Sequence, residues 1–262
     1  MGVEKDSAIV VRSFAFKEAD RIITFLTPSF GKVAVVAKGS RKARSRLSAS
    51  LELFNIGELV FFEKPNRDLH NINSFDVAEP IGVLLRDHFA VAYASYVSQL
   101  ASDISLENDE NPPLFYLLRS ALVAVLAAGT VADLRAIARC FEAKLLTLSG
   151  YRPRLDTCVA CGAQVDEEEV AVGVSIGGAL CPDHAHQDRT LMVSAPGIAA
   201  VRGLTGLTFE AAVAARMTRR QKVESKHLLT MFLAERLERR QRAAEYIDDL
   251  EANVDEMAAL AR

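Results

Sequence analysis

The pattern of apolar residues changes at Pro80. Before this proline, short runs rich in Val, Ile, Phe and Leu are separated by turn signals, which is typical of β-strands. The runs predict strands at Ser7–Phe14, Asp20–Thr27, Gly31–Ala37, Leu51–Glu63 and Leu69–Val77. Five short strands in so short a segment favour a small closed barrel, most economically an OB-fold. A small SH3-like barrel fits almost as well.

After Pro80 the apolar residues follow helical spacing. One helix is predicted over residues 82–106 and a second through Leu126. A third begins at Thr130, an N-cap with Asp133 three residues on, and ends before Gly150. The helical pattern returns at residue 195, and the last helix is predicted from about residue 223 to 250. These apolar stripes are typical of the core of a helix bundle.

The segment 151–190 has a different composition, with the pattern C-x2-C-x19-C-x2-H. Cys158 and Cys161 form the first pair, and Cys181 and His184 form the second. A two-residue spacing lets one turn direct both side chains at one ion, and Gly162 suits the left-handed backbone of such a turn. Zn²⁺ accepts four such ligands, which leave no position for water. The pattern therefore predicts one structural zinc ion.

Two alternatives stay open for this cluster. The cysteines could be free thiols beside unrelated surface histidines, and His186 could replace His184 as the fourth ligand. The remaining cysteine, Cys140, lies on the flank of a helical stripe and is predicted to be a small buried hydrophobic residue.

A basic segment without acidic residues connects two predicted strands. Its interspersed glycine and serine predict an extended, flexible loop whose charges face solvent, and the phosphates of a nucleic acid are the natural counterpart of such charges. A merely solvated charge run is the alternative. We expect the nearby Phe14, Phe16 and Phe30 to be core residues rather than platforms for stacked bases. The predicted DNA-binding residues are Lys32, Lys38, Arg41, Lys42, Arg44 and Arg46.

Composition and missing motifs limit the function classes. The formal net charge of −3 indicates no partner by itself. No nucleotide-binding, hydrolase or metalloprotease motif occurs, so we expect a protein that is not an enzyme. No apolar segment is long enough to span a membrane and the N-terminus does not read as a signal peptide, so we expect a cytoplasmic protein without a membrane partner.

Three stretches resemble the RecO family of recombination mediators. They are Phe16–Arg41, Leu145–Gly162 and Ser175–Cys181, and the resemblance covers roughly residues 5–185. It implies an N-terminal OB-fold, a helical domain and an inserted zinc module. The chain departs from many zinc-bearing members at His184, where those proteins have a cysteine.

The resemblance also implies a function and a set of partners. RecO-like proteins bind single-stranded and double-stranded DNA, contact the acidic C-terminal tail of single-stranded-DNA-binding protein, and work with RecR so that RecA can load. Many also anneal complementary strands. Such a protein would be bacterial, cytoplasmic and nucleoid-associated. Candidate arginines for the acidic tail are only compositional, and we expect them to lie on solvated faces: Arg119, Arg135, Arg139 and Arg152.

Together these features predict an α+β protein, with an N-terminal OB-fold β-barrel followed by an α-helical domain with an inserted zinc module. The predicted boundaries are an OB-fold DNA-binding domain at 1–80, a helical domain at 81–150 and 190–262, and a zinc-binding module at 151–189. Two other functions remain possible. One is a structural, zinc-containing interaction hub, and the other is a zinc-ribbon regulator that binds RNA or duplex DNA.

Overall fold

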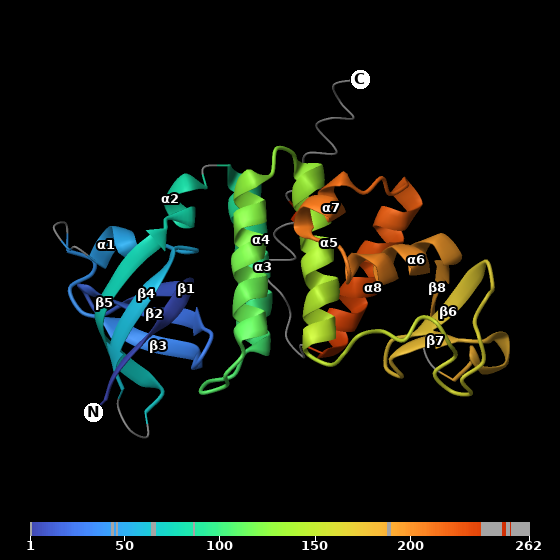
Figure 1. The fold of residues 1–262 in the computed structure, drawn as a ribbon, viewed down its shortest axis with the longest axis horizontal. Coiled ribbons are helices and arrows are strands. Elements are labelled where there is room, and N and C mark those ends of the chain that lie inside the picture. The colour runs from blue at the N-terminus through green and yellow to red at the C-terminus, as the bar shows by residue number, and fades with distance from the viewer. Residues whose placement is uncertain are drawn as a thin grey trace. The chain divides into compact units, whose positions relative to one another are not determined.

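Five strands form a closed barrel at the N-terminus (Figure 1). They are β1 (Val3–Phe16), β2 (Asp20–Thr27), β3 (Gly31–Ala37), β4 (Ile56–Phe62) and β5 (Leu69–Glu79). Neighbours around the barrel follow the order β1-β2-β3-β5-β4, and β1 pairs with β4 to close it. All pairs are antiparallel except β3 with β5. This is the five-stranded Greek-key arrangement of the OB-fold, so the predicted fold class is confirmed.

The computed structural model describes residues 2–42, 45, 47–63, 67–85, 87–187 and 190–236, together with residues 248, 249 and 252. The chain divides into two compact units. The first contains residues 1–134 and 241–262, and the second contains residues 135–240.

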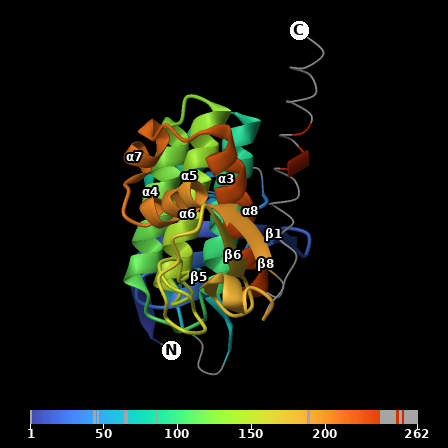
Figure 2. The same ribbon diagram turned by 90° about the vertical axis from the view of Figure 1, so that its right-hand side faces the viewer.

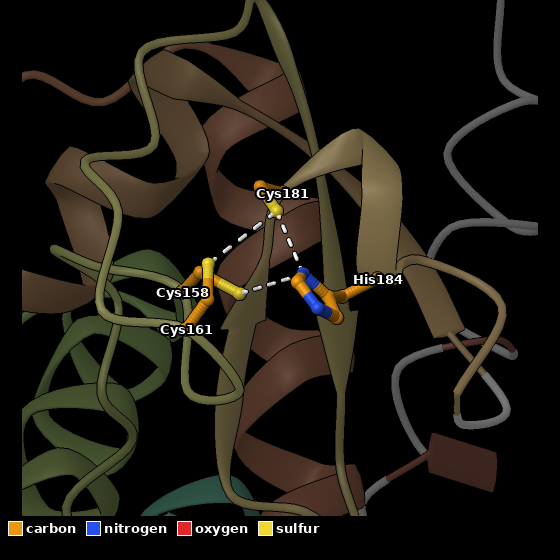
Figure 3. Close-up of side chains that lie close together, drawn as sticks. All are labelled: Cys158, Cys161, Cys181 and His184. Atoms are coloured by element: carbon orange, nitrogen blue, oxygen red, sulfur yellow. Dashed lines mark hydrogen bonds between the residues drawn. The ribbon is translucent and has the colours of Figure 1, made fainter.

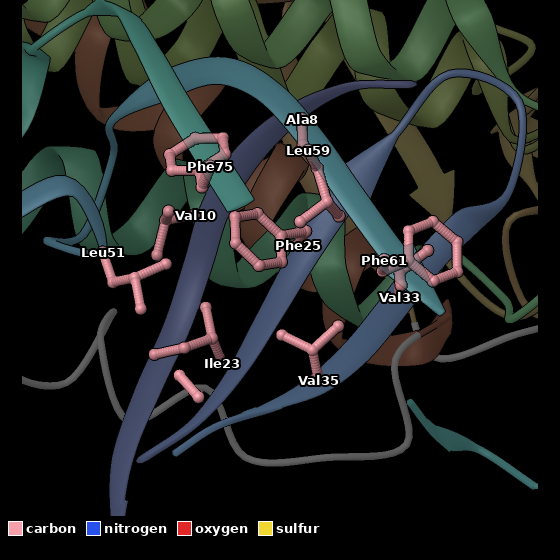
Figure 4. Packing of buried hydrophobic residues seen from close by; sticks show 11 residues of the cluster. Ala8, Val10, Ile23, Phe25, Val33, Val35, Leu51, Leu59, Phe61 and Phe75 are labelled. Atoms are coloured by element: carbon pink, nitrogen blue, oxygen red, sulfur yellow. The ribbon is translucent and has the colours of Figure 1, made fainter. Parts of the chain in front are cut away.

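Alternating side chains of the barrel strands form its core (Figure 4). On β2, Ile23 and Phe25 point inward, and on β3 Val33 and Val35 do so. Phe25 packs against Phe75 of β5 with ring centres 5.0 Å apart. On β3 the period of two in the sequence therefore corresponds to one buried and one less buried face, whereas the four consecutive residues from Ala8 to Val11 of β1 are all buried.

The predicted strand from Leu51 to Glu63 is shorter in the structure. The helical turn α1 (Leu47–Ser50) precedes it, and β4 begins only at Ile56. Leu51 is buried in the barrel core although it is not in a strand. Phe54 has a positive φ of 70°, which breaks the extended backbone before β4. Apolar composition alone did not separate a buried turn from a strand.

The helices of the first unit follow the barrel. They are α2 (Ile81–Leu84), α3 (His88–Ile104) and α4 (Pro112–Ala127). The single helix predicted over residues 82–106 is thus two, because the carboxylate of Asp87 caps α3 by accepting a hydrogen bond from the Ala90 amide at 3.0 Å. Helices α3 and α4 pack against each other, and they contact β1 and β2 respectively.

Helix α5 (Val131–Leu148) begins with the predicted capping box. The Asp133 amide donates to the Thr130 hydroxyl at 3.2 Å, and the Thr130 amide donates to the Asp133 carboxylate at 2.9 Å. Two backbone donors at the start of the helix are therefore satisfied by side chains.

The second unit contains a small sheet that the sequence did not predict. Strands β6 (Glu169–Gly173), β7 (Gly178–Leu180) and β8 (Thr190–Ser194) pair in the order β7-β6-β8, and the 3₁₀ turn η1 (Pro182–His184) follows β7. Helices α6 (Ala195–Leu204), α7 (Phe209–Ala214) and α8 (Arg219–Arg236) come next. Helix α8 lies beside β8 (Figure 2). The rest of the last predicted helix lies largely outside the described residues.

None of the described helices combines the length and apolar character that a membrane crossing requires.

A substitution in β4 tests the close packing of the barrel. A Cβ added at Gly57 would overlap the carbonyl oxygen of Asp76 on β5. We expect Gly57→Ala to lower the free energy of unfolding by about 1–3 kcal/mol, because backbone must move to relieve the overlap. Gly203→Ala in α6 is the control, since nothing lies within 4 Å of the added carbon. Equal urea-unfolding curves for the two variants would contradict this packing.

Candidate functional site

Three cysteines and one histidine converge beside the small sheet (Figure 3). The ligand atoms of Cys158, Cys161, Cys181 and His184 all lie within 4.8 Å of one another. The Cys161 and Cys181 sulfurs are 3.9 Å apart, and His184 Nδ1 is 3.1 Å from the Cys181 sulfur and 3.9 Å from the Cys158 sulfur. The two sequence pairs therefore meet in space.

Backbone hydrogen bonds hold the first pair in place. The Gly162 amide donates to the Cys158 carbonyl at 2.9 Å, and Gly162 has the positive φ of 78° that such a turn needs. The Val159 amide donates to the Ala179 carbonyl of β7 at 2.9 Å. This bond holds the turn at Cys158 against β7, the strand that precedes Cys181.

The second pair sits on η1. Cys181 precedes this turn, and the His184 amide donates to the Cys181 carbonyl at 2.9 Å. This local bond brings the imidazole back toward the cysteine that starts the turn. His186 is exposed and is not part of the cluster, so the local backbone favours His184 as the histidine of the site.

Hydrogen bonds and burial act in opposite directions on the thiols. Burial raises the pKa of the Cys158 thiol, but hydrogen bonds from backbone amides, those of Cys181 and Cys161 foremost, lower it to about 6. Burial and hydrogen bonds with the other two thiols raise the pKa of Cys181. A thiolate at Cys158 is therefore available near neutral pH, and the thiolate is the form that binds a metal.

The spacing of the cluster suits a tetrahedral ion. Zn–S bonds of about 2.3 Å at tetrahedral angles give S···S separations of about 3.8 Å. The 3.9 Å between the Cys161 and Cys181 sulfurs is close to that value. Three thiols and one imidazole are also the donor types that structural zinc sites use. The residues present thus fit one metal ion with no position left for water.

Cys140 is separate from this cluster. It is fully buried in α5, and its thiol lies 3.5 Å from the Leu204 carbonyl oxygen. Burial raises its pKa to about 11, so it stays a neutral thiol. The prediction of a small buried hydrophobic residue is confirmed.

Three of the six predicted DNA-binding cations are exposed where β3 ends. They are Lys38, Arg41 and Lys42, whereas Arg44 and Arg46 lie outside the described residues. Within the described part of the chain, no carboxylate forms an ion pair with any of these three. Their charges are therefore not neutralised by a carboxylate of the described residues and remain available to a polyanion.

The loop that carries these cations is tied to the β1–β2 turn. The Arg41 amide donates to the Ala19 carbonyl at 3.0 Å, and the Arg41 guanidinium donates to the carbonyls of Lys17 and Glu18 at 3.3 and 3.1 Å. The Gly39 amide donates to the Asp20 carboxylate at 2.9 Å. This start of the basic segment is thus a fixed turn rather than the flexible loop expected from its composition.

Lys32 lies apart from the other cations. It is at the opposite end of β3 from Lys38. The six residue steps between them span about 20 Å in an extended strand. Lys32 lines a hollow together with Arg67 and three carboxylates, which are those of Glu63, Asp68 and Glu107. The charge around Lys32 is therefore mixed, unlike the charge around Lys38.

The three phenylalanines expected in the core have different positions. Phe30 packs beside the core with its ring centre 5.6 Å from that of Phe61. Phe16 is half-buried, and Phe14 has 43% of its surface exposed. The expectation is therefore wrong for Phe14. Its outward direction depends on the β1–β2 register, which the sequence pattern does not define.

The arginines considered as candidates for the acidic tail differ in exposure and in ion pairing. The Arg139 side chain is only 14% exposed and pairs at 2.6 Å with the fully buried carboxylate of Glu142, so the expected solvated position is wrong for this residue. Arg119 pairs with Glu79 at 2.8 Å, and Arg152 is exposed. Arg135 also has an interaction within the fold. Helical spacing did not reveal the buried Arg139–Glu142 pair.

Comparison with known proteins agrees with this architecture. Residues 1–81 match the family model described as "Recombination protein O N terminal", and residues 85–245 match "Recombination protein O C terminal". Similar proteins named "DNA repair protein RecO" come from Anaeromyxobacter dehalogenans strain 2CP-C and Roseiflexus sp. strain RS-1. The first is 34% identical over 94% of this chain and 96% of its own length. The second is 35% identical over 95% of this chain and 86% of its own length.

A third relative, from Desulforamulus reducens, bears the same name and is 31% identical over 95% of this chain and 96% of its own length. The matches thus extend over both the barrel and the region that contains the cysteine cluster. The chain belongs to the RecO family of DNA repair and recombination proteins.

Proposed function

We propose that this protein is a recombination mediator that binds single-stranded and double-stranded DNA and works without a catalytic step of its own. It contacts the acidic tail of single-stranded-DNA-binding protein, acts with RecR to let RecA load, and anneals complementary strands. The family supports the role in DNA repair and recombination. A bacterial cytoplasmic location at the nucleoid follows from this role.

The observation that carries the proposal is the set of exposed cations on a rigid barrel. Lys38 and Lys42 are exposed and have no ion-pair partner among the described residues, and the turn between them is fastened to the β1–β2 hairpin. Fixed cations that are already free of carboxylates attract phosphates without first breaking an internal ion pair. We assign the DNA contact to these residues and to Arg41, and extend it to Arg44, Arg46 and Lys32.

We further propose that one Zn²⁺ ion is bound by Cys158, Cys161, Cys181 and His184. When bound, the ion supplies a structural cross-link between the turn at Cys158 and the turn at His184. These segments contain only short strands and little apolar core, with Leu180 and Ala171 its main buried residues. We propose that the zinc module spans residues 151–189, that it is inserted in a helical domain of residues 81–150 and 190–262, and that the DNA-binding barrel spans residues 1–80.

Neutralising two lysines tests the DNA contact. We expect Lys38→Gln/Lys42→Gln to weaken binding to single-stranded oligonucleotides and to reduce the slope of log K against log salt by about 1.4, since each phosphate contact contributes about 0.7. Fluorescence anisotropy across a salt series measures both values. Lys5→Gln is the control, because Lys5 lies on the same barrel but pairs with Glu58 at 2.8 Å. An unchanged slope in the double variant would exclude this loop as the contact.

Metal content tests the proposed zinc ligands. Native mass spectrometry should find one zinc per chain in the wild type, none in Cys161→Ala, and reduced zinc in His184→Ala. His186→Ala should retain zinc, because His186 is outside the cluster. Zinc affinity should also fall as the pH is lowered, because protons compete with the metal for the thiolates and the imidazole. A folded wild-type protein without metal would refute the site.

Partner binding tests the mediator role. A peptide copy of the acidic tail should bind the full chain, and the chain together with RecR should speed RecA assembly on single-stranded DNA coated with single-stranded-DNA-binding protein. A peptide of the same composition with reversed order is the control. Binding to neither the tail peptide nor DNA would eliminate the mediator function.

A further inference from the structure

The outer face of the β1–β2–β3 sheet carries a second feature next to the cations. In the antiparallel register, Phe14 is opposite Ile22, and Ile22 is opposite Val36. These residues alternate with the inward-facing Ile23 and Val35, so the three side chains form one apolar row on the outside of the barrel. Ile22 and Val36 are partly buried, whereas Phe14 is 43% exposed at the end of the row.

Phe16 follows Phe14 on the same face of β1, and a cation lies over each of the two rings. The Arg12 guanidinium carbon is 5.6 Å from the ring centre of Phe14, and the Lys17 ammonium nitrogen is 5.3 Å from that of Phe16. Residues two apart on a strand are about 7 Å apart. An aromatic ring with a cation over one face can stack on a base only through its other face, and the cation supplies a charge for a phosphate.

This aromatic face is continuous with the fixed basic turn. The hydrogen bonds from Arg41 to the carbonyls of Lys17 and Glu18 hold the turn against the end of the same hairpin. Residues 12–20 of the hairpin and residues 38–42 of the turn together contain five cations and two carboxylates. They are Arg12, Lys17, Lys38, Arg41 and Lys42, with Glu18 and Asp20. Arg21, the next residue of the hairpin, pairs with Glu52. The carboxylate of Asp20 already accepts a hydrogen bond from the Gly39 amide.

We propose that Phe14 and Phe16 form a base-stacking platform for single-stranded DNA, with Lys38 and Lys42 holding the adjacent phosphates. This inference rests on the proposed DNA-binding function and deepens it. The excess of positive charge favours a polyanion, and the exposed Phe14 ring with the half-buried Phe16 ring favours one that presents unpaired bases. In a duplex the bases are stacked on one another, so the platform adds affinity for single strands only.

A tryptophan reporter tests the stacking directly, because the chain contains no tryptophan. In Phe14→Trp, binding of oligo(dT) should quench the indole fluorescence, since a base stacks on the ring. Tyr116→Trp on α4 is the control, at a position that is 57% exposed and outside the platform. Its fluorescence should not change on saturation with oligo(dT). An unquenched Phe14→Trp at saturating oligo(dT) would overturn the platform.

Truncation of the ring tests its contribution to affinity. Phe14→Ala should bind oligo(dT) about 5- to 10-fold more weakly than the wild type, whereas Phe14→Tyr should retain wild-type affinity. Binding to an abasic oligonucleotide of the same length should be equal for all three proteins, because that ligand has phosphates but no bases. The melting temperature of each variant checks that the barrel remains folded.

The two proposals fail in different ways. If the platform is wrong but the basic turn binds DNA, Lys38→Gln/Lys42→Gln weakens binding to both oligonucleotides while Phe14→Ala changes neither. If the DNA contact itself is wrong, neither set of variants alters binding to either ligand. Equal weakening of oligo(dT) and abasic binding by Phe14→Ala would also overturn the platform, because it would indicate a general disturbance of the hairpin.

Discussion

The pairing of β1 with two different neighbours is the constraint on which the barrel depends. Residues 3–9 of β1 pair with β4 and close the barrel, whereas residues 9–16 pair with β2 and form a hairpin. The register shifts between Val10 and Arg12, and such an irregularity increases the local twist of a strand. One long strand therefore supplies both the closure of the core and the hairpin that carries Phe14.

The β1–β2 hairpin also holds the basic turn of Lys38, Arg41 and Lys42 in place. The Gly39 amide donates to the Asp20 carboxylate and the Arg41 amide donates to the Ala19 carbonyl, so the position of the basic turn does not depend on salt bridges of its cations. A net charge of −3 gives no hint of this, since local arrangement and not the total decides where a polyanion binds. A mediator without a fuel-consuming step needs such contacts, because it can only exchange one set of bound groups for another.

In the second unit, the cysteine–histidine cluster lies beside a sheet that has little apolar core of its own. This sheet consists of strands of three to five residues, too short to provide much buried apolar surface. Side chains that bind one ion can replace part of the missing core, as they do in small metal-dependent folds. The cluster would then stabilise the module that contains it, while the proposed contact with DNA lies on the barrel.

The sequence by itself determined the features that depend on neighbours along the chain. The strand alternation, the capping box at Thr130 and the paired ligands around Cys158 are of this kind, because each arises within a few residues. Only the tertiary structure decided which alternate face of β1 is outward, that Arg139 pairs with a buried carboxylate, and that Lys32 is remote from Lys38. These depend on pairing register and packing between segments distant in sequence, which periodicity and composition do not specify.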